Sequence, residues 1–110
     1  MKQGDIVWAD LNPTQGSEQA GVGPVVIISG NAMNQHFGVV IARPLSTQMK
    51  HLPGCVAIEK DSKNGLQTDS EVIRFQLRTI AQQRLRTKIG EISQQQLQAI
   101  IQGLNDVLTY

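Results

Sequence analysis

The stretch GDIVWADLNPTQGSEQAGVGPVVIIS occupies residues 4–29 and holds two apolar runs separated by a polar, glycine-rich segment. The first run, at residues 6–11, contains the only tryptophan of the chain and ends at an Asn-Pro pair, which favours a strand followed by a turn. The second run, at residues 25–29, is rich in Val and Ile, as expected for a strand buried on both faces. Residues 13–23 between the two runs are predicted to form a long loop.

Further apolar and β-branched runs continue this pattern after residue 29. They predict strands at residues 38–45, 55–59, 71–77 and 88–92, a loop at 31–37, a polar connection at 60–69 and a short helical turn at 81–85. The predicted fold is mainly β, a compact antiparallel sheet curled into a barrel.

The C-terminal segment changes to a helical period. Ser93 followed by Gln96 is a capping-box pattern that marks a helix start. The apolar positions that follow are three and four residues apart, at Leu97, Ile100, Ile101, Leu104, Val107 and Leu108. We therefore expect a C-terminal helix that lays this stripe on the sheet.

Length and composition favour a soluble protein with one core. The chain has 110 residues, of which 40% are hydrophobic, and this suits a single domain spanning residues 1–110. Cys55 is the single cysteine and cannot form an internal disulfide, as is typical of cytoplasmic proteins. The longest aliphatic run, residues 25–28, is far shorter than the roughly 20 residues of a membrane span, so we expect no membrane association.

Charge permits nucleic-acid binding without demonstrating it, because the net charge is only +1. Cations nevertheless cluster in a window without Asp or Glu, at Arg74, Arg78, Arg84, Arg86 and Lys88. Arg43 and Lys50 bracket a second acid-free segment. The simpler interpretation of both is a solvated protein face.

Histidine, cysteine and tryptophan give little sign of a cofactor or a metal. His36 and His51 have no spacing that would make them an acid–base pair, and we interpret both as surface residues. Two separated histidines and one cysteine provide no zinc-ligand spacing. Trp8 is interpreted as core or dimer-interface packing, in preference to a platform for base stacking.

Three motifs in a fixed order resemble one known family. GDIVWADLNPTQGSEQAG at residues 4–21, LSTQ at 45–48 and QLRTIAQQRL at 76–85 are similar to segments of the MazF/PemK (Kid) toxins. These are mRNA interferases of type II toxin–antitoxin systems, which cleave single-stranded RNA without a metal. The resemblance implies the CcdB/MazF/Kid-like, SH3-like barrel, an endoribonuclease activity and no cofactor.

The resemblance also implies a catalytic pair, and this chain lacks half of it. The arginine of the family's AG-x-RP segment falls on Gly23, and the family's catalytic threonine falls on Ser46. A PemK-like acid before the Gln of the Q-x-RT segment is replaced by Phe75. Serine keeps a hydroxyl, but glycine keeps neither charge nor donor, so we expect this copy to be inactive or attenuated.

Two explanations for Gly23 remain open. One is a natural relative that has lost or relocated its arginine, for which Arg74 is the candidate. The other is a deliberate inactivating change, which the preservation of the surrounding motif favours. A residue before proline adopts extended backbone as readily with arginine as with glycine, so Pro24 gives no conformational reason for the glycine.

The resemblance implies an RNA surface and protein partners as well. The RNA-binding candidates are Asn12, Glu18, Gln19, Thr47, Gln48, Arg74, Gln76, Arg78 and Thr79. A plainer interpretation remains open for Arg78, which can pair with Asp69 or Glu71. The implied partners are single-stranded RNA, a MazE/PemI-like antitoxin and a second copy of the chain.

Two other functions compete with an active nuclease. CcdB-like gyrase poisons share the fold, but their activity depends on a tryptophan near the C-terminus, and Trp8 is the only tryptophan here. A non-catalytic family member that binds RNA or antitoxin is the second, and Gly23 is the feature that favours it.

Overall fold

A computed structural model describes residues 1–11, 21–52, 55–73 and 76–109, without the side chain of Val107. In chain order the elements are β1 (Asp5–Asp10), β2 (Val22–Ile27), α1 (Asn31–His36), β3 (Val39–Ser46), β4 (Val56–Ile58), β5 (Ser70–Val72), β6 (Arg78–Ala81), the 3-10 turn η1 (Gln82–Arg84), β7 (Leu85–Glu91) and α2 (Gln94–Thr109).

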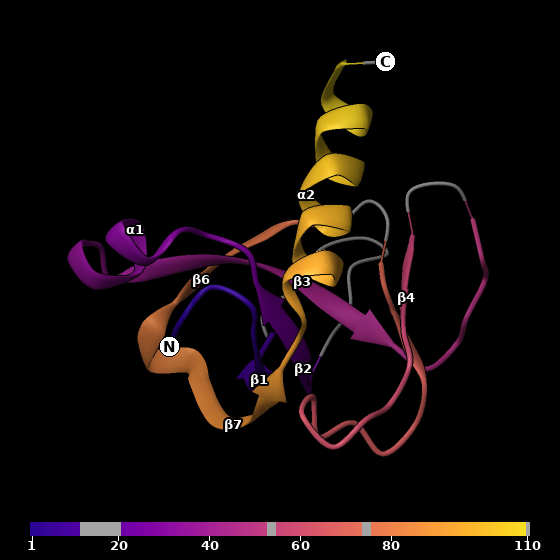
Figure 1. Ribbon diagram of the computed structural model, residues 1–110. Helices are drawn as coiled ribbons and strands as arrows, with labels where there is room; N and C mark the ends of the chain where they lie inside the picture. The colour runs from indigo at the N-terminus through magenta and orange to yellow at the C-terminus, as the bar shows by residue number, and fades with distance from the viewer. Residues whose placement is uncertain (12–20, 53–54, 74–75, 110) are drawn as a thin grey trace.

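The strands form one antiparallel sheet in the order β4-β5-β3-β2-β1-β7, and β6 pairs with β3 outside this path. The first half of β3 pairs with β6, through Val39 to Ala42, and its end pairs with β5, through Leu45 and Ser46. The η1 turn then carries the chain from β6, beside β3, to β7, beside β1. The sheet is therefore curled around an interior, which confirms the predicted barrel-like β fold (Figure 1).

Alternate residues of the strands supply two apolar cores, one on each face of the sheet. The inner core consists of Val7, Ala9, Leu11, Val25, Ile27, Val40, Ala42 and Ile80, with Leu85 packed against it. The outer core includes Ile6, Val26, Leu45, Ile58, Val72 and Ile100, the last from α2. Because Ala9 and Ala42 are small, the curled strands can approach each other closely across the inner core.

Most of the predicted strands are confirmed with shifted ends. The runs at residues 6–11, 38–45, 55–59 and 88–92 correspond to β1, β3, β4 and β7. β2 begins at Val22 and ends at Ile27, earlier than the predicted 25–29. Its early start follows from Gly21, whose φ of 77° turns the chain and whose carbonyl accepts the backbone N–H of Leu11 at 2.9 Å.

Two predictions for the middle of the chain are wrong. The single strand expected at residues 71–77 is two strands, since β5 ends at Val72 and β6 begins at Arg78. The two segments are separate strands, because they pair with different parts of β3. The loop expected at residues 31–37 is the short helix α1, where Gln82 donates its side-chain amide to the carbonyls of Asn34 and Phe37.

The C-terminal helix starts as predicted, but only its first half is covered. The backbone N–H of Ser93 donates to Gln96 Oε1 at 2.9 Å, and that of Gln96 donates to Ser93 Oγ at 3.1 Å, which completes the capping box. Leu97 and Ile100 are buried. Ile101, next to the fully buried Ile100, is nevertheless 43% exposed and therefore faces away from the sheet. Leu108 is 74% exposed, because the C-terminal end of α2 extends beyond the sheet (Figure 1).

Neither α1 nor α2, the α-helices of the described residues, is long and apolar enough to cross a membrane.

Candidate active site

The predicted site residues fall into two groups. Gly23, Ser46, Thr47, Gln48, Gln76, Arg78 and Thr79 belong to the described part of the chain. Asn12, Glu18, Gln19 and Arg74 lie outside the described residues, as does Phe75. The geometry of the site is therefore built from β2, β3, β6 and the turn after β3.

The sheet brings the two predicted catalytic positions onto neighbouring strands and one face. Gly23 lies in β2, opposite Ala9 of β1, and its alternation with Val25 and Ile27 directs it to the inner face. Ser46 ends β3, whose inner-face residues are Val40 and Ala42. The β2–β3 ladder ends at the pair Val25–Pro44, and Gly23 and Ser46 each lie two residues beyond that pair on their own strand.

Arg78 places a guanidinium at this same end of the inner face. It pairs with Ala42 of β3, and its Nη2 donates to the backbone carbonyl of Leu11, just after β1, at 2.9 Å. The side chain thus spans the interior from β6 to β1. Thr79 is opposite Ile41, on the other face, so the sheet separates it from Arg78 although the two are adjacent in sequence.

The turn after β3 fixes the Ser46 hydroxyl. The backbone N–H of Gln48 donates to Ser46 Oγ at 3.1 Å, in a local serine turn. Ser46 is partly buried, whereas Thr47 and Gln48 are exposed. Because the Oγ accepts the turn hydrogen bond, its own proton can be donated to a phosphate oxygen.

The same turn is hydrogen-bonded to a buried carboxylate, that of Glu71, which was not predicted from the sequence. Glu71 pairs with Ser46 across β3 and β5 and is 3% exposed. Its Oε1 accepts the backbone N–H of Lys50 at 3.0 Å, and its Oε2 accepts that of His51 at 3.2 Å. His51 has a φ of 54°, an uncommon value for a residue other than glycine, so the carboxylate stabilises a strained turn.

Burial raises the pKa of Glu71, but the hydrogen bonds from Lys50 and His51 favour the charged form and outweigh it, so that its pKa lies below 4.5. The stability that this contributes is present above pH 4.5 and is lost as the pH falls through the lowered pKa. We therefore expect the free energy of unfolding of Glu71→Gln to approach that of the parent protein as the pH falls through the lowered pKa of Glu71. Urea unfolding from pH 7 to pH 3 measures this, and a difference independent of pH would contradict it.

The cation-rich window has acidic partners that the sequence did not reveal. β7 lies beside β1, where Asp5 accepts from Lys88 at 3.2 Å and Asp10 lies 3.9 Å from Arg86. Hydrogen bonding to Asp5 raises the pKa of Lys88. The interpretation of Arg43 as a solvated cation is wrong, since it is 1% exposed and its Nη2 donates to the carbonyl of Ile73 at 2.6 Å.

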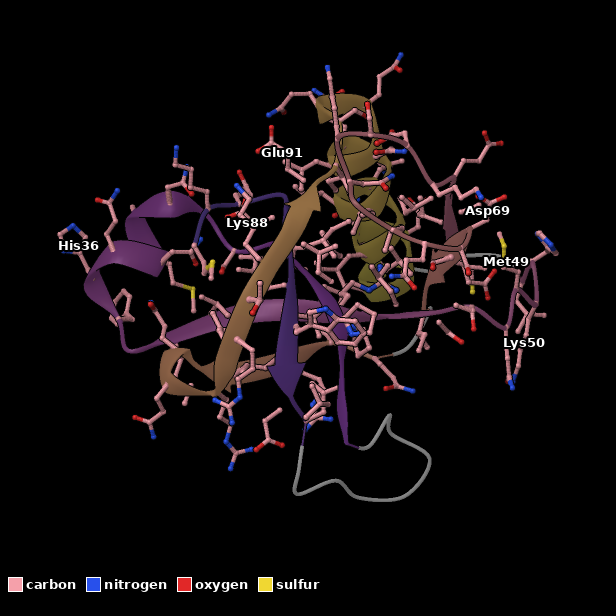
Figure 2. The ribbon with its side chains drawn as sticks, turned by 90° about the horizontal axis from the view of Figure 1, so that it is seen from below. His36, Met49, Lys50, Asp69, Lys88 and Glu91 are labelled. Atoms are coloured by element: carbon pink, nitrogen blue, oxygen red, sulfur yellow. The ribbon has the colours of Figure 1, made fainter. Side chains whose placement is uncertain are left out.

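His36 and His51 are both exposed, as predicted. They belong to opposite sides of the molecule, because His36 lies at the α1 end and Lys50, which precedes His51, lies at the far end (Figure 2). Within the ranges described, no three His, Cys, Asp or Glu side chains gather in a way that could hold a metal ion. Of the two alternatives for Trp8, core packing is wrong, because this side chain is 42% exposed, whereas dimer-interface packing stays a prediction.

Comparison with known proteins agrees with this fold. A family described as the PemK-like, MazF-like toxin of type II toxin–antitoxin systems matches residues 2–108. Endoribonuclease MazF of Staphylococcus saprophyticus is 37% identical over 102 residues, covering 91% of this chain and 84% of that protein. Endoribonuclease EndoA of Bacillus subtilis is 33% identical over 105 residues, covering 94% and 90%.

A solved structure of a mycobacterial endoribonuclease in complex with its cognate antitoxin superposes with a TM-score of 0.76 at 26% identity. The match covers 98% of this chain and 92% of that one. With a family match over almost the whole sequence and two relatives above 30% identity, the chain belongs to the PemK/MazF family of type II toxin–antitoxin toxins.

Proposed function

We propose that this chain is the toxin scaffold of a type II system, an endoribonuclease fold for single-stranded mRNA whose activity is attenuated by Gly23. The observation that supports the proposal is that Gly23 and Ser46 lie on neighbouring strands, each two residues beyond the last β2–β3 pair, with the Arg78 guanidinium at the same end. Residues 1–110 act as one toxin domain, and the site of action is the cytoplasm.

The chemistry follows from what RNA itself supplies. Its 2′-hydroxyl can attack the adjacent phosphate, so the protein must accept one proton, donate another and stabilise the charge on the phosphorane. Ser46 donates a hydrogen bond or relays a proton. An arginine at position 23 would donate two hydrogen bonds to the phosphoryl oxygens. Gly23 has no side chain that can do this.

RNA binding is assigned to side chains around this pair. Thr47 and Gln48 follow Ser46 directly, and Arg78 reaches the same end of the inner face. Gln76, Thr79, Asn12, Glu18, Gln19 and Arg74 are proposed by motif alone. Because no metal is needed for attack by the 2′-hydroxyl, the products of a Gly23→Arg variant in EDTA test the function. Fragments ending in 2′,3′-cyclic phosphate support it, and 3′-hydroxyl ends contradict it.

A non-catalytic role is the second candidate, favoured by the missing side chain at Gly23. In that case the scaffold binds RNA or a MazE/PemI-like antitoxin without cutting. It is distinguished by the same variant, because restored arginine would leave binding intact and still produce no cleavage. The antitoxin itself is proposed as a partner because a similar solved structure contains one.

We also expect a symmetric homodimer that covers the exposed end of α2. Ile101 and Leu108 are apolar and largely exposed there, and a two-fold contact would bury both copies of this surface. Light scattering after size exclusion should give twice the 12.1 kDa chain mass at micromolar concentration. Leu108→Glu should shift the protein toward monomer, with Gln98→Glu on the same helix as a matched control. A parent protein that is monomeric throughout would contradict the prediction.

A further inference from the structure

An open pocket of about 340 Å³ lies beside Trp8, on the face of the sheet opposite Gly23 and Ser46. Trp8 alternates with the inner-core residues Val7 and Ala9, so its indole stands on the other side. The pocket is lined by Trp8, Pro24, Thr47, Gly65, Leu66, Gln67, Thr68, Ser70, Thr87, Lys88 and Ile89. An indole that is 42% exposed in a concave site is available to a ligand.

The wall formed by residues 65–68 is held rigidly against β7. Asn64 is fully buried and donates its side-chain amide to the carbonyl of Glu59 at 2.8 Å. Its Oδ1 accepts the backbone N–H of Leu66 at 3.0 Å. Gly65 has a φ of 68° and lies directly on the backbone of Ile89, where no side chain would fit. The pocket is therefore shaped before any ligand arrives.

Its lining combines an aromatic face with hydrogen-bonding edges. Around the indole stand hydroxyl and amide side chains, contributed by Thr47, Gln67, Thr68, Ser70 and Thr87. Lys88 adds an ammonium group whose exposed fraction is 43% and whose three donors are not exhausted by Asp5 and Glu91 (Figure 2). An aromatic ring with hydrogen-bonding groups at its edge, next to a phosphate, matches the indole, the polar side chains and the ammonium group of this lining.

Two lining residues connect the pocket to the candidate active site. Pro24 follows Gly23 in β2, and Thr47 follows Ser46 at the end of β3. Gly23 and Pro24 are consecutive in β2 and face opposite sides, and Thr47 begins the turn directly after β3. A single RNA strand passing over this end of the sheet could therefore reach both faces. An apolar anchor from a protein partner would instead leave the hydroxyl and amide groups without partners.

We propose that this pocket binds one unpaired nucleobase of single-stranded RNA, stacked on Trp8, next to the phosphate held between positions 23 and 46. This subsite rests on the proposed RNA-directed function and adds to it a place where the protein grips a base. Stacking on Trp8 supplies affinity, and the surrounding Thr, Ser and Gln side chains contact the base edge.

The single tryptophan makes the test direct. A 2′-O-methyl RNA ten-mer, which lacks the attacking hydroxyl, is titrated into the full chain while tryptophan emission and fluorescence anisotropy of a labelled copy are recorded. We expect quenching that saturates together with the anisotropy. Trp8→Leu should weaken the Kd about fivefold to a hundredfold, and Trp8→Phe should retain most of the affinity.

Phe37→Leu is the matched control, because it removes an exposed aromatic ring at the α1 end, 62% exposed, without touching the pocket. Circular dichroism melts show whether each variant is folded. The subsite is overturned if RNA binds the parent protein without changing its tryptophan emission and binds Trp8→Leu with an unchanged Kd. That outcome would favour a protein ligand for the pocket and would leave the proposed function intact. Loss of RNA binding by both the parent and Gly23→Arg overturns the function itself.

Discussion

Replacing Gly23 with arginine is expected to raise the rate of RNA cleavage by about a hundredfold or more, because one transition-state donor is typically worth that much. Gly23 is one pair from the end of the β1–β2 ladder, which closes with Asp10 and Val22. Gly23 is buried, so an arginine there would have to extend along the inner face toward these strand ends to present its guanidinium. The measurement is single-turnover cleavage of a long single-stranded RNA in EDTA.

Two controls keep the result specific to position 23. Gly38→Arg adds the same charge at an exposed glycine with open space around it, and it should leave the rate unchanged. Ser46→Ala in the Gly23→Arg background should remove most of the gain, since the hydroxyl acts on the same phosphate. A parent protein that cleaves as fast as Gly23→Arg would show that no side chain at this position is needed.

A large loss of stability from a single methyl group is expected at Gly90. This glycine of β7 lies directly on the backbone of Lys63 and Asn64, and a Cβ there would overlap their carbonyl groups. The turn that contains Lys63 and Asn64 cannot move away without losing a hydrogen bond, because the backbone N–H of Glu91 donates to the Lys63 carbonyl at 3.0 Å. We expect Gly90→Ala to lower the free energy of unfolding by about 1–3 kcal/mol or more.

Denaturant unfolding of Gly90→Ala beside Gly38→Ala measures this effect. Position 38 has no neighbouring atom within 4 Å of an added Cβ, so its variant should stay within about 0.5 kcal/mol of the parent. Equal stabilities for the two alanine variants would mean that the turn at residues 61–66 yields freely. In that case the rigid wall inferred for the Trp8 pocket would also be wrong.

Features that depend on local pattern could be predicted from the sequence. The aliphatic runs gave β1 to β4, and the Ser93–Gln96 pair gave the start of α2, because strand burial and helix capping act over a few residues. The split between β5 and β6 was missed because residues 71–77 contain no glycine or proline to break the apolar run. Only the long-range pairing with two parts of β3 separates them.

The candidate site, too, depends on long-range strand pairing that a local sequence pattern does not reveal. Motifs identified Gly23, Ser46 and Arg78 by position, but a sequence does not say which strands become neighbours or which faces meet. The roles of Glu71 and Arg43 were invisible, because charged residues are expected on the surface and these two are buried by contacts with distant backbone. The core alternative for Trp8 was wrong for the opposite reason, since an aromatic residue in an apolar strand is usually buried.

The strand β3 is hydrogen-bonded along both edges, to β2 on one side and to β6 and then β5 on the other. Its amides can exchange with solvent only when several pairings from distant parts of the chain open together, so they belong to the slowest-exchanging unit of the protein. Ser46 closes this strand. The hydroxyl of the candidate site thus belongs to the segment that unfolds last, and local opening of the exposed loops need not change its position.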